Sequence, residues 1–218
     1  MPWSISRVYT LPQPAVIDLF KSIPEVEVVY WVKDLEGMSD HSRKSVFSEV
    51  PTEYSHMRHG LPNGGLLAIV PDVDTDYYGK QDRRKKRAAI TNDFGEIKEL
   101  PTALHLNISH FNLFYSLKHV HDQTGVPIMY YECATWGGPP DIELAVVFDN
   151  GIFVYWYNKE TQKNVQTIDN QDFEIQTAVL QKGLEHLGLS LPTDYFVLHS
   201  RPFDWGRYSI FVRWLDEV

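Results

Sequence analysis

Cysteine is almost absent from this chain, because Cys133 is the only one among its 218 residues. A single cysteine rules out an internal disulfide and a Cys-x-x-Cys redox pair, and it predicts a reducing, cytoplasmic environment. Cys133 ends a β-rich run beside Ala134, so we expect it to be a small buried hydrophobe. A Cys/His enzyme would need a histidine that folding brings close to the thiol.

Long apolar runs are missing as well. No stretch approaches the roughly 18 apolar residues of a membrane-spanning helix. The segment from Met1 to Arg7 lacks the basic stretch and the apolar core of a signal peptide. We therefore expect neither secretion nor a membrane partner.

Standard catalytic and metal-binding signatures are not found either. The chain has no G-x-S-x-G elbow, no P-loop and no dinucleotide-binding fingerprint. The segment 72–76 alternates aspartates as a calcium loop does, but Arg83 stands where the bidentate glutamate belongs. The nine histidines show no HExxH spacing, and we expect them to be structural or solvated. We predict no metal and no cofactor.

The charge balance is acidic, with a net charge of −9 at pH 7 and a pI near 5.4. This acidity disfavours a nucleic-acid partner and predicts that any protein partner is more basic than the chain. The run from Arg83 to Arg87 is the one strong basic feature, and it lacks interleaved aromatic residues. A solvated face is its simplest interpretation, with phosphate contact or a localisation signal as alternatives.

The composition, 43% hydrophobic and 13% aromatic, provides a substantial core for a chain of this length. We predict one α+β domain over residues 1–218, with a weak subdomain boundary near 100. Its helices are expected at 15–21, from Asn107 to Gly125, and over about 172–187. The helix after Asn107 has a clear apolar stripe, formed by Leu113, Phe114, Leu117 and Val120.

Three strands are predicted to form a central antiparallel meander, at about 128–133, 142–148 and 152–157. Because Asn150-Gly151 is the preferred type I′ turn pair, we expect Asp149 opposite Ile152 and Val147 opposite Val154. Both faces of the hairpin 142–157 are apolar, so helices or another sheet should cover it, and we expect two amphipathic helices to pack against the meander. Further strands are expected at 26–32, 66–70, 195–199 and 208–214, and linkers at 72–87 and 158–170.

The best candidate site is the hairpin that joins the first two meander strands. If this hairpin closes symmetrically around 134–141, Cys133 faces Ile142 and Glu132 stands opposite Glu143 on one face of the sheet. Like charges in that position require a shared proton, a cation or a basic partner. A different register, with both carboxylates solvated, is the alternative.

The loop of this hairpin contains Gly137-Gly138, whose bare backbone would let a ligand or a partner chain approach. Trp136 offers an apolar anchor beside it. The glycines alternatively serve only the turn. The candidate partner-binding residues are Glu132, Trp136, Gly137, Gly138, Asp141 and Glu143.

Several features of the stretch 111–153 occur together in a known group of proteins. They are Gly125-Val126-Pro127-Ile128, Tyr130, Glu132, Gly137-Gly138, Ala145-Val146-Val147-Phe148 and Gly151. This combination resembles small uncharacterised bacterial proteins that are encoded with toxin systems as immunity factors. Similar proteins carry a Gly-x-Gln-like continuation after the glycine pair, where this chain has Pro139-Pro140-Asp141. The resemblance implies an intracellular protein that neutralises a toxin.

Three functional hypotheses follow. The first is a non-catalytic protein-binding module, an immunity protein among them, whose acidic and aromatic surface meets a more basic partner. The second is a hydrolase or metal-assisted hydrolase in which Glu132 and Glu143 supply acid, base or metal ligation. The third is an assembly subunit whose aromatic surface forms a homo-oligomer interface.

Overall fold

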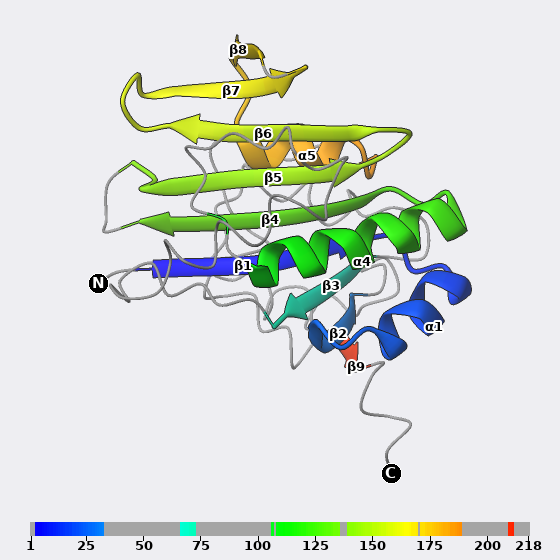
Figure 1. Ribbon diagram of the computed structural model, residues 1–218. Coiled ribbons are helices and arrows are strands. Elements are labelled where there is room, and N and C mark those ends of the chain that lie inside the picture. The colour runs from blue at the N-terminus through cyan, green and yellow to red at the C-terminus, as the bar shows by residue number, and fades with distance from the viewer. Residues whose placement is uncertain are drawn as a thin grey trace, which may run out of the picture.

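The computed structural model describes residues 3–32, 66–72, 106, 108–135, 139–169, 171–188 and 209–211. In these residues, nine strands form one antiparallel sheet in the order β8-β7-β6-β5-β4-β1-β3-β2-β9, accompanied by three helices (Figure 1). The elements are β1 Trp3–Thr10, α1 Pro14–Ser22, β2 Val26–Val32, β3 Leu66–Pro71, α4 Ile108–Thr124, β4 Ile128–Thr135, β5 Ile142–Phe148, β6 Ile152–Asn158, β7 Lys163–Ile168, β8 Gln171–Ile175, α5 Val179–Glu185 and β9 Ser209–Phe211. The expected α+β class with an antiparallel meander is confirmed.

The meander is longer than the sequence predicts. β4, β5 and β6 lie where strands are expected, and the chain then continues through β7 and β8. The linker predicted at 158–170 is therefore wrong, because β7 pairs along β6 and buries Val165 and Thr167. The helix predicted from about 172 begins only at Val179, because the residues before it form β8.

β1 is a central strand that sequence patterns do not reveal. It pairs with β4 over eight residues on one side and with β3 on the other. It thereby joins the meander to β2, β3 and β9 in a single sheet. The strand predicted at 195–199, the boundary near 100 and the run from Arg83 to Arg87 lie outside the described residues.

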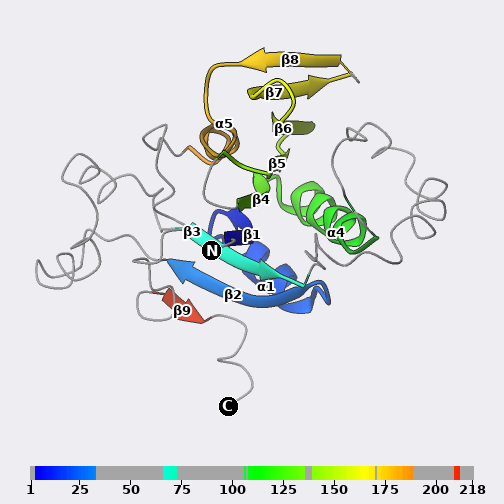
Figure 2. The ribbon, with the colours of Figure 1, turned by 90° about the vertical axis from the view of Figure 1, so that its left-hand side faces the viewer.

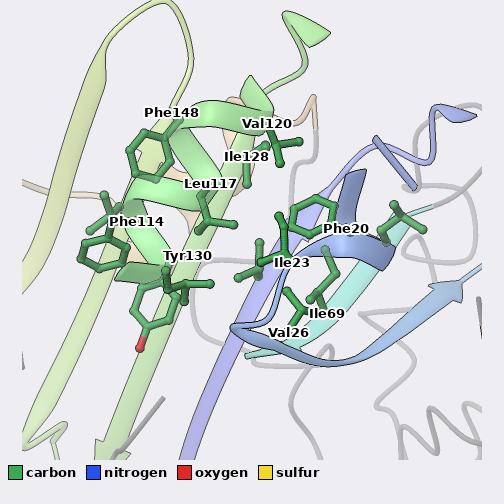
Figure 3. Packing of buried hydrophobic residues seen from close by; sticks show 14 of the residues in the cluster. Phe20, Ile23, Val26, Ile69, Phe114, Leu117, Val120, Ile128, Tyr130 and Phe148 are labelled. Atoms are coloured by element: carbon green, nitrogen blue, oxygen red, sulfur yellow. The ribbon is translucent and has the colours of Figure 1, made fainter. Parts of the chain in front are cut away.

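Helices cover both faces of the meander, as expected. Figure 2 shows α4 and α5 on opposite sides of the sheet. On the α4 side, helix and strand side chains interlock in one apolar core, together with Phe20 of α1 (Figure 3). The labelled members of this core include Phe114, Leu117, Val120, Ile128, Tyr130 and Phe148.

α4 begins and ends close to its predicted limits. Its apolar stripe is fully buried, and Gly125 follows its last turn with a φ of 67°. The Gly125 N–H donates to the His121 carbonyl oxygen at 2.7 Å. Glycine adopts this left-handed conformation without strain, so it closes the helix as the sequence predicts.

α5 lies very close to the strands on the other face. A Cβ at Gly183 would collide with Met129 Sδ and come within 3.2 Å of Ala145 Cβ. The missing side chain therefore lets the α5 backbone settle against β4 and β5. No helix in the described parts of the chain is long and apolar enough to cross a membrane.

The β5–β6 turn differs from its predicted form. Phe148 pairs with Ile152 and Val147 with Phe153, so the expected pairing of Asp149 with Ile152 is wrong by one residue. Contacts with the helices hold this longer turn. The Asn150 N–H lies 3.2 Å from His121 Nε2, and Asp149 Oδ2 lies 2.8 Å from His186 Nδ1. Tertiary contacts here outweigh the local preference of Asn-Gly for a two-residue turn.

Candidate functional site

The register of β4 with β5 separates the two glutamates of the candidate hairpin. Cys133 pairs with Glu143, and Glu132 pairs with Leu144. The expected pairing of Glu132 with Glu143 is therefore wrong, because a slip of one residue moves a side chain to the other face of the sheet. Glu132 faces α4 and Glu143 faces α5. This arrangement lacks the carboxylate pair that the two-glutamate hydrolase requires.

Glu132 is an interior residue of the α4 face, 2% exposed. Its Oε2 accepts a hydrogen bond from the Tyr130 hydroxyl at 2.9 Å and lies 3.2 Å from Nε2 of the buried His110. Burial raises the pKa of Glu132 to about 8, so the side chain is mainly protonated at neutral pH. Oε1 is buried with no hydrogen-bond partner among the described residues.

Glu143 is an interior residue of the opposite face, 5% exposed. It accepts hydrogen bonds from the Tyr131 hydroxyl at 3.0 Å and from the backbone N–H of Leu180 in the first turn of α5. Burial raises the pKa of Glu143 as well. Ala178, at the N-cap of α5, provides no side-chain hydrogen bond, so Glu143 caps this helix from the neighbouring strand.

Cys133 is buried as a free thiol between the same elements. Burial and the neighbouring Glu143 raise the pKa of Cys133 to about 12. The reactive form of cysteine is the thiolate, which this environment disfavours at neutral pH. The sequence prediction of a small buried hydrophobe is confirmed.

Of the remaining candidate residues, the structure describes Asp141 alone. Asp141 is partly exposed, and its Oδ1 lies 2.5 Å from Lys159 Nζ. Trp136, Gly137 and Gly138 lie outside the described residues. The acidic surface expected from Glu132, Asp141 and Glu143 is wrong for the two glutamates, because α4 and α5 bury the strand faces that carry them.

An exposed surface that the sequence interpretation missed lies at the end of the meander. β8 pairs with β7 alone in the described part of the chain, and its residues from Gln171 to Glu174 are exposed. Phe173 is 48% and Ile168 is 47% exposed. Figure 2 shows β7 and β8 extending past both helices, so neither helix covers them.

The two faces of this edge differ in chemistry. Phe173 pairs with Gln166 and Gln171 pairs with Ile168, so Phe173 and Ile168 are diagonal neighbours on the α5 side of the sheet. Asp172 and Glu174 point to the α4 side. We call Ile168, Asp172, Phe173 and Glu174 the β8 edge surface. The alternation of polar and apolar residues in Gln171–Ile175 is the sequence signal that indicates this strand.

Hydrogen bonds position the two acids of the β8 edge surface. Thr167 Oγ1 donates to Asp172 Oδ1 at 2.7 Å and accepts from Trp156 Nε1 at 3.0 Å. Lys163 forms an ion pair with Glu174, and its hydrogen bond lowers the pKa of that carboxyl. Both carboxylates are therefore held along one side of the strand.

A second group missed from sequence joins α5 to the β5–β6 hairpin. His186 Nδ1 lies 2.8 Å from Asp149 Oδ2, and His186 Nε2 lies 3.0 Å from the Tyr155 hydroxyl. A carboxylate, an imidazole and a hydroxyl in series also occur in nucleophilic catalysis. Here burial raises the pKa of Tyr155, and the tyrosine is almost fully buried, so the group acts as an anchor for α5.

Within the described residues, no group of three or more His, Cys, Asp or Glu side chains is placed to hold a metal ion. Comparison of the chain with family models, curated proteins and solved structures gives no match. The resemblance of the stretch 111–153 to immunity proteins therefore stays a prediction.

Proposed function

We propose that this chain is a non-catalytic, cytoplasmic protein-binding module whose partner is more basic than itself. The observation that carries the proposal is the β8 edge surface, where the carboxylates of Asp172 and Glu174 lie on one face and the half-exposed side chains of Phe173 in β8 and Ile168 in β7 lie on the other. Apolar contacts supply binding energy, and complementary charge orients the partner and speeds its approach.

Neutralisation of a toxin is the role that the sequence resemblance favours for such a module. The interior of the chain supports binding over chemistry. Glu132 and Glu143 lie on opposite faces of the sheet, and each is engaged by tyrosine hydroxyls. Both acids serve the fold, which leaves the outer surface for recognition.

The test is co-purification of the tagged full-length chain with the products of the genes that adjoin its own, followed by calorimetric titration. We expect a stoichiometric complex that weakens as the salt concentration rises, because salt screens exposed charges. The double variant Asp172→Lys/Glu174→Lys should weaken the complex at least about tenfold.

The matched control is Asp18→Lys/Asp122→Lys, which changes the net charge equally at exposed positions of α1 and α4. It should leave the affinity within about twofold of the wild type. Recovery of no stoichiometric partner, or equal losses in the two double variants, would contradict the proposed site.

A further inference from the structure

A partner can bind the backbone of β8 as well as the side chains of β8. In an antiparallel sheet, every second residue of an edge strand directs its N–H and C=O away from the neighbouring strand. β8 uses its other side for β7, and no described strand pairs with its outer side. An extended segment can therefore add itself there as a further strand.

The side chains of β8 specify what that segment must contain. A residue opposite Phe173 would lie on the α5 side beside Phe173, where an apolar side chain removes exposed area of Phe173 from water. The residues before and after it would lie opposite Asp172 and Glu174. Opposite charges facing each other across strands stabilise pairing, so these two positions favour Lys or Arg.

A second copy of this chain fits the edge poorly. Antiparallel pairing of two β8 strands about Phe173 would place Asp172 of each copy opposite Glu174 of the other. Like charges directly opposite one another destabilise strand pairing. Pairing of β8 with a second β8 strand is therefore disfavoured, and pairing with a basic strand is favoured.

We infer that the partner adds a β-strand to β8, in which one apolar residue stands between two basic residues. This inference rests on the proposed function and specifies its binding mode. The backbone pairing supplies affinity, and the basic-apolar-basic alternation supplies specificity.

The test uses a fluorescein-labelled peptide, Ser-Thr-Lys-Val-Lys-Thr-Ser, and fluorescence anisotropy with the full-length chain. A peptide of the same composition with adjacent lysines, and one with Glu-Val-Glu at the centre, serve as controls. We expect the first peptide to bind at least about tenfold more tightly than either control. The Asp172→Lys/Glu174→Lys variant should reverse the preference toward the Glu-Val-Glu peptide.

Two N-methylated forms of the Lys-Val-Lys peptide separate strand addition from simple surface attraction. One carries N-methyl groups on both lysines and the other carries one on the valine. Neighbouring residues of a strand direct their N–H groups to opposite sides, so one of these peptides should lose binding and the other should keep it. Equal binding, or equal loss, would overturn strand addition.

The two proposals fail in different ways. If the natural partner weakens with Asp172→Lys/Glu174→Lys while the methylated peptides behave alike, the binding function stands and the strand-addition mode falls. If the variant binds the natural partner as the wild type does, the β8 edge surface is not the binding site. Circular dichroism of each variant verifies that it is folded.

Discussion

At the scale of single residues, this protein keeps two acids in its interior, one of them beside the buried His110. Each carboxyl group is held by a tyrosine hydroxyl, and burial raises both pKa values. A buried carboxylate is costly, whereas a protonated carboxyl group with hydrogen-bond partners is tolerated. Glu132 therefore behaves as a neutral polar residue near physiological pH, and burial shifts the pKa of Glu143 in the same direction.

Replacement of Glu132 by glutamine should change how stability depends on pH. The pKa of Glu132 is about 8 in the folded chain, against an ordinary value of 4.5. Between these values the folded chain keeps a proton that the unfolded chain releases, so the free energy of unfolding falls as pH rises. Glu132→Gln removes this fall in stability with rising pH, because glutamine does not ionise. We expect its stability relative to the wild type to improve by a few kcal/mol between pH 5 and 9, measured by urea unfolding.

The control for this measurement is Glu174→Gln, which removes an exposed acid whose pKa is lowered by Lys163. That carboxyl group titrates below pH 4.5, so the variant should follow the wild-type pH dependence between pH 5 and 9. If the free energy of unfolding depended on pH in the same way in Glu132→Gln and in the wild type, Glu132 would already be ionised in the folded chain.

Glu143 is expected to act through its acceptor oxygens and not through charge. Glu143→Gln keeps an acceptor for the Tyr131 hydroxyl and the Leu180 N–H, and should be tolerated. Glu143→Leu removes the acceptor of the Leu180 N–H and one hydrogen bond of the Tyr131 hydroxyl, and should cost about 1–3 kcal/mol of unfolding free energy. Amide hydrogen exchange at Leu180 reports the cap directly. Equal exchange rates in the two variants would refute the capping role.

At the scale of elements, the sequence predicts what the local pattern determines. α4 has an apolar stripe and a closing glycine, and β2 and β5 are rich in β-branched residues, so their limits are predicted closely. β7 and β8 are polar strands that depend on pairing with β6. The short alternation in β8 does not show which strand lies beside it, and the β8 edge surface is missed for that reason.

Register is the other property that local pattern leaves open. The prediction for both hairpins differs from the structure by one residue, which reverses the face of every side chain in the second strand. Runs such as Leu144 to Phe148 are apolar on both faces, so alternation cannot fix the pairing. The turn contacts of His121 and His186 come from distant helices. The two-glutamate hypothesis failed for this reason.

Close packing of α5 against the sheet should make Gly183 sensitive to the smallest enlargement. Alanine at an exposed helical position is about 1 kcal/mol better than glycine. At Gly183 the new methyl group would collide with Met129 Sδ, and we expect a net loss of about 1–3 kcal/mol in chemical denaturation.

A double variant assigns that loss to packing. Met129→Ala removes the colliding sulfur, so Gly183→Ala combined with Met129→Ala should lose less than the sum of the two single changes. Additive losses would mean that the methyl group is accommodated in some other way and that α5 does not rest on Met129.

At the scale of the whole molecule, the sheet has a centre that the helices cover and an end that none of the described helices covers. α1, α4 and α5 lie over the central strands, whereas β7 and β8 extend past the helices (Figures 1 and 2). The covered strands contain the two buried glutamates, and the β8 end of the sheet holds the exposed acids Asp172 and Glu174. The exposed acids at this edge are accessible to a proposed partner. The net charge of −9 of the whole chain would attract a basic partner to it.

The same placement predicts how the chain associates with itself. In the wild type, antiparallel pairing of two β8 strands would set Asp172 against Glu174 of the second copy on both sides of Phe173, so this edge should not form dimers. Glu174→Lys replaces both repulsions by attractions and retains the exposed Phe173. We expect sedimentation velocity to show a concentration-dependent dimer for this variant and none through this edge for the wild type. A wild-type dimer that Phe173→Asp dissolves would instead make β8 an interface between copies, because the apolar contact would then outweigh the repulsion of the four acids.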